Sequence, residues 1–98
     1  IQTGASSNVT VDDAANCKTN FAVTTTVKST IEVLCRGSGS ADNKRYVAIL
    51  DAEKTKLVGE GNLGSNKVTL TTKTLDAGIY TIAANGSRIF SITVKAAE

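Results

Sequence analysis

The 98-residue chain contains no histidine, tryptophan, methionine or proline, and only two phenylalanines and two tyrosines. Without histidine it lacks the side chain that most often serves as a general base near neutral pH, and it has no imidazole ligand for a metal. Most hydrolytic mechanisms and zinc sites are therefore disfavoured, and we expect a protein that is not an enzyme and carries no metal or other cofactor. No apolar run approaches the 18 residues of a transmembrane helix, so we expect no membrane partner.

The charge balance is mild. Eleven basic and nine acidic residues give a formal net charge of +2. Binding to nucleic acid needs lysine and arginine crowded on one face, so we expect no nucleic-acid partner. A local basic site for an acidic ligand is still compatible with this composition.

What the chain has in quantity is β-branched residues, because thirty of its positions are valine, isoleucine or threonine. Such residues pack well on pleated surfaces and lose freedom in helices. Short alternating or apolar runs occupy residues 9–11, 20–27, 30–36, 46–52, 57–58, 67–73, 79–84 and 88–95. Asn85–Gly86 between the last two runs is a strong hairpin signal. With no sustained 3.6-residue period, the pattern predicts an antiparallel β-sandwich of seven or eight strands, immunoglobulin-like or jelly-roll-like.

The length of the chain fits one domain. Residues 1–8 are small and polar and are typical of a linker end, which leaves residues 9–98 as a single sandwich module. Cys17 and Cys35 predict a disulfide worth about 3 kcal/mol in the chain-entropy model, because a small domain with a thin core gains from a cross-link. The disulfide in turn favours a secreted protein. The alternative is a pair of buried thiols.

The C-terminal half has the features of a known module. RYVAILDAEKTKLVG is followed by a glycine-rich loop and then by KVTLTTKTLDAGIYTIAANGSRIFSITV, which contains the pattern L-x-A-G-x-Y-T-I. Residues 45–94 resemble the pectin-binding carbohydrate-binding modules of family 77, which are appended to bacterial polysaccharide lyases such as pectate lyases. The resemblance implies a β-sandwich that binds homogalacturonan largely through basic side chains. It also implies a covalently linked catalytic domain in the parent protein.

The composition is compatible with that ligand. Many sugar-binding surfaces stack a pyranose ring on tryptophan or tyrosine, and with only Tyr46 and Tyr80 available an aromatic platform is nearly excluded. A polyuronate instead offers a carboxylate on each sugar. Arginine can hold such a group bidentately, and lysine can meet it as a point charge.

Three basic residues are the first candidates for the binding site. Lys18 and Arg36 directly follow the two cysteines, so a disulfide would make them near neighbours. Arg88 has the strand parity of the apolar residues Phe90, Ile92 and Val94 and is expected at the end of their face. Three further candidates come from loops or strand ends and would extend the patch: Lys28, Lys44 and Arg45. The alternative for each is a solvated surface charge.

The sequence therefore predicts a secreted, monomeric, non-catalytic module that recognises low-esterified homogalacturonan and targets a linked lyase to it. One alternative from another class is an immunoglobulin-like structural or adhesion domain that binds no glycan. A second alternative is a catalytic fragment, which the absence of histidine and the short chain oppose.

Overall fold

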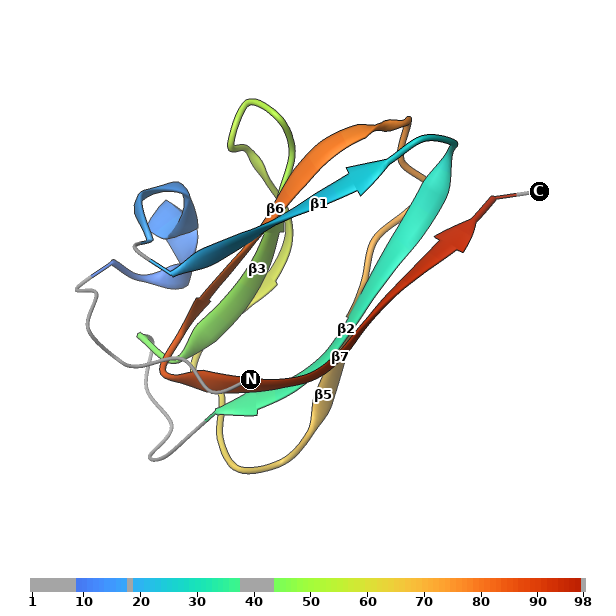
Figure 1. Cartoon of the computed structure of the whole chain (residues 1–98). Helices are drawn as coiled ribbons and strands as arrows, with labels where there is room; N and C mark the ends of the chain where they lie inside the picture. Colours follow the sequence, from blue (N-terminus) through green and yellow to red (C-terminus); the bar gives the residue numbers. More distant parts are fainter. Residues whose placement is uncertain (1–8, 18, 38–43, 98) are drawn as a thin grey trace.

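The described residues fold into seven antiparallel strands and one short 3₁₀ helix, and the strands form two facing sheets (Figure 1). The structure is a computed structural model, and it describes residues 9–17, 19–37 and 44–97. The elements in chain order are η1 (Val11–Asn16), β1 (Asn20–Thr25), β2 (Ser29–Gly37), β3 (Tyr46–Leu50), β4 (Lys56–Glu60), β5 (Val68–Thr71), β6 (Gly78–Asn85) and β7 (Ser87–Ala96). The predicted all-β antiparallel sandwich is confirmed.

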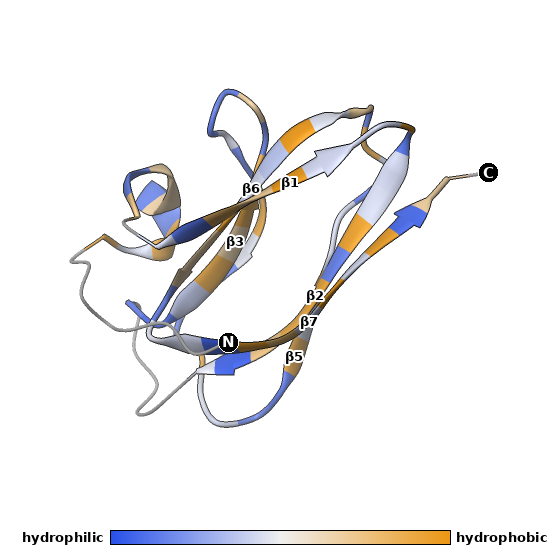
Figure 2. Ribbon diagram, viewed as in Figure 1, coloured by the Kyte–Doolittle hydropathy of each residue, from blue (hydrophilic) through white to orange (hydrophobic). Residues whose placement is uncertain are grey.

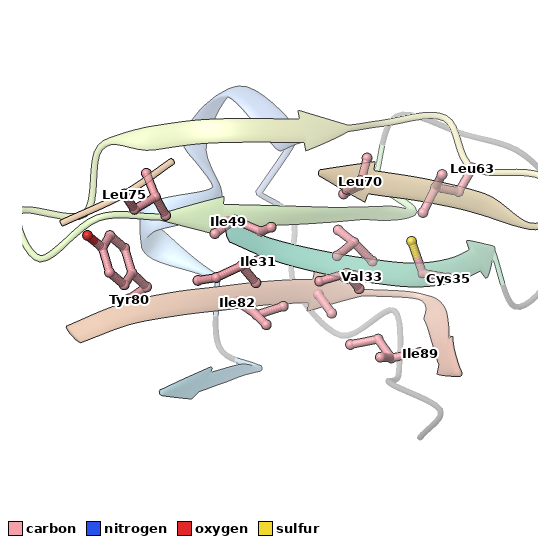
Figure 3. Close-up of a cluster of buried hydrophobic side chains, with 12 residues drawn as sticks. Ile31, Val33, Cys35, Ile49, Leu63, Leu70, Leu75, Tyr80, Ile82 and Ile89 are labelled. Atoms are coloured by element: carbon pink, nitrogen blue, oxygen red, sulfur yellow. The ribbon is translucent and has the colours of Figure 1, made fainter. Parts of the chain in front are cut away.

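The four-stranded sheet has the order β1-β6-β3-β4, and the three-stranded sheet has the order β5-β2-β7. The main core lies between them, and Figure 3 shows its side chains pointing toward one another from both sheets. Along β2 the residues alternate between buried and half-buried, with Ile31, Val33 and Cys35 facing the core. This alternation is typical of a strand with one face on the core and the other turned outward.

The outer face of the four-stranded sheet carries a second apolar cluster. Its buried members are Ala14, Cys17, Tyr46, Ala48, Leu50 and Ala83, with Val11 packed against them. Helix η1 supplies Ala14 and Val11 and lies over β3, which explains why all five residues of β3 are buried. The predicted strand at residues 9–11 is therefore wrong, because Val11 begins a 3₁₀ helix that covers a sheet.

The two cysteines are free thiols, and the predicted disulfide is not present. Cys17 belongs to the cluster on the outer face of the four-stranded sheet, where its Sγ donates to the backbone oxygen of Ala84 at 3.4 Å. Cys35 lies on β2, in the core between the sheets. A sheet therefore separates the two sulfur atoms, and the pair of buried thiols that the sequence left as the alternative is what the structure contains. The inference of secretion loses the support that the disulfide provided.

A β-bulge in β7 changes the faces that the sequence predicts for this strand. Leu34 pairs with Ser91 and Cys35 with Ile89, so Phe90 is an extra residue without a partner in the register. An extra residue shifts the two-residue alternation by one position. Ile92 therefore lies opposite the core residue Val33, whereas Arg88 lies opposite Arg36. The prediction that Arg88 shares a face with Ile92 and Val94 is wrong for this reason.

None of the described residues forms a helix long and apolar enough to cross a membrane.

Candidate anion-binding face

Two arginines face each other on neighbouring strands of the three-stranded sheet. Arg36, near the end of β2, is the register partner of Arg88, near the start of β7. Partners in an antiparallel pair have Cα atoms about 4.5–5.5 Å apart and project to the same side of the sheet. Because Cys35 points into the core, both arginines project from the opposite, outer face. Figure 2 shows the strand ends at this position coloured as hydrophilic, beside the apolar middle of the sheet.

The backbone beneath Arg36 is held tightly. The Gly37 amide donates to the carbonyl oxygen of Gly64 at 2.7 Å, so the end of β2 is tied to the loop before β5. A Cβ at position 37 would overlap the carbonyl group of Leu63, which restricts this position to glycine. The guanidinium of Arg36 donates from Nη1 to the Gly37 oxygen at 3.1 Å. The arginine pair therefore rests on a rigid part of the sheet.

Neither arginine forms an ion pair with an acidic side chain of the described residues. The Nε atom of Arg88 is buried and has no hydrogen-bond partner among those residues. Glu32 is the acid of β2 that shares the outer face, four residues from Arg36, or about 13 Å along the strand. Like charges placed directly opposite each other in a sheet are destabilising. The pair is thus a place where an anion would relieve the repulsion between the two guanidinium groups.

Lys67 and Phe90 extend the same face. Val68 packs against the core, so the alternation directs Lys67, the residue before it, outward. Its Nζ atom lies 4.7 Å from the centroid of the Phe90 ring. Since β5 and β7 flank β2, this contact spans the width of the sheet across β2. We call Arg36, Lys67, Arg88 and Phe90 the β2–β7 face.

Lys44 and Arg45 lie at the same end of the sandwich as the arginine pair. Arg45 donates from Nη1 to the carbonyl oxygen of Gly86 at 3.4 Å, and the side-chain amide of Asn85 donates to the carbonyl oxygen of Lys44. Both residues therefore flank the tight turn that leads into Arg88. They are neighbours of the β2–β7 face, although they belong to the end of the other sheet.

Lys28 does not join this group. It lies in the turn before β2, where its carbonyl oxygen accepts a hydrogen bond from the Ala97 amide. The length of β2 separates it from Arg36 by roughly 26 Å. Lys18 lies outside the described residues, and its expected place beside Arg36 depended on a disulfide that is absent.

The opposite end of the sandwich has a shallow pocket of about 290 Å³, lined by Asp51, Leu57, Lys73, Thr74, Leu75, Asp76 and Tyr80. Asp51 is used structurally, because its Oδ1 accepts hydrogen bonds from the backbone amides of Glu53 and Thr55. Tyr80 donates its hydroxyl hydrogen to the Asp76 carbonyl oxygen at 2.5 Å. Across the described part of the chain, no group of three or more Cys, Asp or Glu side chains is placed to hold a metal ion. The pocket is lined by both acidic and basic residues, and the Asp51 carboxylate and the Tyr80 hydroxyl already form hydrogen bonds within the protein. The lining therefore does not indicate a class of ligand.

The sequence did not indicate Lys67 or Phe90 as candidate binding residues. A lysine before an alternating strand is usually a solvated charge, and Phe90 has the parity of a core residue unless the bulge is known. The one usable signal was the clean alternation of Val68 and Leu70, which directs Lys67 outward. The role of each basic residue in ligand binding stays a prediction.

The described structure is a β-sandwich in which Arg36, Arg88 and Lys67 lie at one end of the outer face of the three-stranded sheet. No protein-family model matches the chain, and no curated protein matches it. One similar solved structure is a family 35 carbohydrate binding module from an environmental isolate. It has a TM-score of 0.42 and 15% sequence identity, over 81% of this chain and 70% of that chain. A likeness at this level does not establish a shared function.

Proposed function

We propose that this chain is a non-catalytic module that binds an acidic polysaccharide on the β2–β7 face. The observation that carries the proposal is the cross-strand pairing of Arg36 with Arg88, in which neither residue has an acidic partner among the described residues. Such a pair does not stabilise a sheet, since like charges opposite each other repel. An anionic ligand gives the arrangement a use.

A polyuronate fits this face better than a small anion does. The face is an open sheet surface, and a single small anion is usually held in a concave site. A polymer with repeated carboxylates can gain from several cations at once, each forming charge-assisted hydrogen bonds, and here Lys67 is exposed while Arg36 and Arg88 are half-buried. Arg36, Arg88 and Lys67 lie on the face, and Lys44 and Arg45 flank it. The resemblance of residues 45–94 to pectin-binding modules makes low-esterified homogalacturonan our specific choice.

The proposal extends to the protein that would contain this module. The chain would be secreted, and it would target a covalently linked lyase to pectin. Tethering raises the concentration of the lyase at its substrate without new chemistry. Binding should weaken with salt, which screens exposed charges, and with methyl esterification, which removes them.

Affinity electrophoresis in de-esterified homogalacturonan, highly esterified pectin and a neutral glucan tests the proposal. We expect retardation in the first gel only. The double variant Arg36→Ala/Arg88→Ala should bind at least about tenfold more weakly, because each charge-assisted hydrogen bond is worth about 1.5–3 kcal/mol. Affinity should also fall as the salt concentration rises.

The matched control is Lys28→Ala/Lys73→Ala, which also removes two positive charges, but from exposed positions far from the face. It should retain most of the retardation. Equal loss in both double variants would show that net charge alone binds the polymer, and the site would be wrong. An immunoglobulin-like structural or adhesion domain, the alternative from the sequence, would migrate equally in all three gels.

A further inference from the structure

Phe90 is the aromatic side chain that the fold leaves exposed. Tyr46 and Tyr80 are buried, and Phe21 is half-buried against the core, whereas Phe90 is 46% exposed. Its exposure comes from the bulge, which adds a residue to β7 and places the ring on the outer face beside Lys67. A half-exposed ring contributes less to folding than a buried one, and the contact that the structure shows for it is the one with Lys67. The sequence predicted no aromatic platform on the basis of its tyrosines and its lack of tryptophan, and that prediction did not take phenylalanine into account.

The ring and the cations together match one class of ligand. The C–H face of a pyranose packs on an aromatic ring, as apolar surfaces pack on aromatic side chains generally. A carboxylate on that same sugar would lie within reach of Lys67, which contacts Phe90 from across the sheet, or of Arg88, which lies two residues before Phe90 on β7. A simple polyanion such as polyglutamate can use the cations but offers no sugar ring to Phe90.

We propose that Phe90 is a stacking platform for a uronate ring and that Lys67 covers this platform until the sugar arrives. In the structure the Lys67 ammonium lies over the Phe90 ring, with its Nζ atom 4.7 Å from the ring centroid, in a cation–π contact. The flexible four-carbon stem of lysine lets the ammonium move from the ring to the sugar carboxylate. The exchange replaces a cation–π contact by a stacked sugar and an ion pair. This inference rests on the proposed function and makes the β2–β7 face selective for anionic sugars over other polyanions.

The test compares binding of oligogalacturonate with binding of poly-L-glutamate of similar carboxylate content, by titration calorimetry. Phe90→Ala should weaken oligogalacturonate binding about threefold to tenfold, the scale of one aromatic packing contact, and leave polyglutamate binding unchanged. Lys67→Gln should weaken both ligands and lower the salt dependence of both. Equal weakening of the two ligands by Phe90→Ala would overturn the platform.

A second variant provides a direct readout. The chain has no tryptophan, so Phe90→Trp introduces a single fluorophore at the platform. Oligogalacturonate should change its emission by stacking on the indole, and polyglutamate, which can draw Lys67 off the ring but has no sugar to stack on it, should change the emission less. Val27→Trp is the control, because Val27 is 53% exposed in the turn before β2, far from the face. Unchanged emission of the Phe90→Trp variant at saturating oligogalacturonate would overturn the inference. If the wild-type chain bound neither ligand, the proposed function itself would fail, which is a distinct outcome.

Discussion

The two outer faces of the sandwich differ in whether another element of the fold covers them. On the four-stranded sheet, helix η1 covers Tyr46, Ala48 and Leu50 and forms a second apolar cluster. On the three-stranded sheet, none of the described elements makes comparable contacts with the outer face, which carries Arg36, Arg88 and Lys67 around an exposed ring. The covered face adds to the stability of the fold. The bare face places charges and an aromatic group where a ligand can reach them.

The largest expected difference between the faces is in stability. Tyr46→Ala removes a fully buried ring from the covered face and should lower the free energy of unfolding by about 3–5 kcal/mol. Phe90→Ala removes a half-exposed ring from the bare face and should cost less than about 1.5 kcal/mol. Urea denaturation of both variants measures the contrast. Similar losses would mean that the bare face contributes to the fold as much as the covered one does.

The next effect concerns the core between the faces. Burial, with a smaller contribution from the charge of Glu60, raises the pKa of Cys35 from 9.0 to about 11. Between these values the unfolded thiol loses its proton while the folded thiol keeps it, so stability is full below pH 9 and falls as the pH rises toward 11. The loss attributable to this thiol should be about 2–3 kcal/mol. Cys35→Val, which has no titrating group, should lack that part of the decline in urea titrations run from about pH 8 to pH 11.

The smallest effect has the opposite sign. Arg36→Gln relieves the repulsion between the two arginines and should raise the free energy of unfolding by about 0.2–1 kcal/mol at low salt. The gain should shrink when salt screens the charges. Lys95→Gln is the control on the same sheet, because its register partner is Thr30, which has no charge. A loss of stability in Arg36→Gln at low salt would show that the pair is structural and would weaken the case for a ligand.

Much of the fold could be predicted because it depends on local pattern. The alternation of Ile31, Val33 and Cys35 identifies β2 and its core face, and Asn85–Gly86 identifies the hairpin, with Gly86 at a positive φ of 56°. The helix at Val11–Asn16 could not be predicted in this way. It is short, and it is held by contact with β3 and β4 rather than by its own propensity.

The candidate site, like the fold, has features that local sequence pattern predicts and features that depend on tertiary contacts. The sequence by itself determined that a histidine-free, tryptophan-free chain rich in β-branched residues would be a sandwich with a few basic side chains available to an anion. Only the tertiary structure decided which of those side chains meet. The pairing of β2 with β7 placed Arg36 opposite Arg88, and one bulge turned Phe90 outward to Lys67. The layering of the sheets also separated the two cysteines. Strand register and the placement of layers arise from contacts between residues distant in sequence, and no local pattern encodes them.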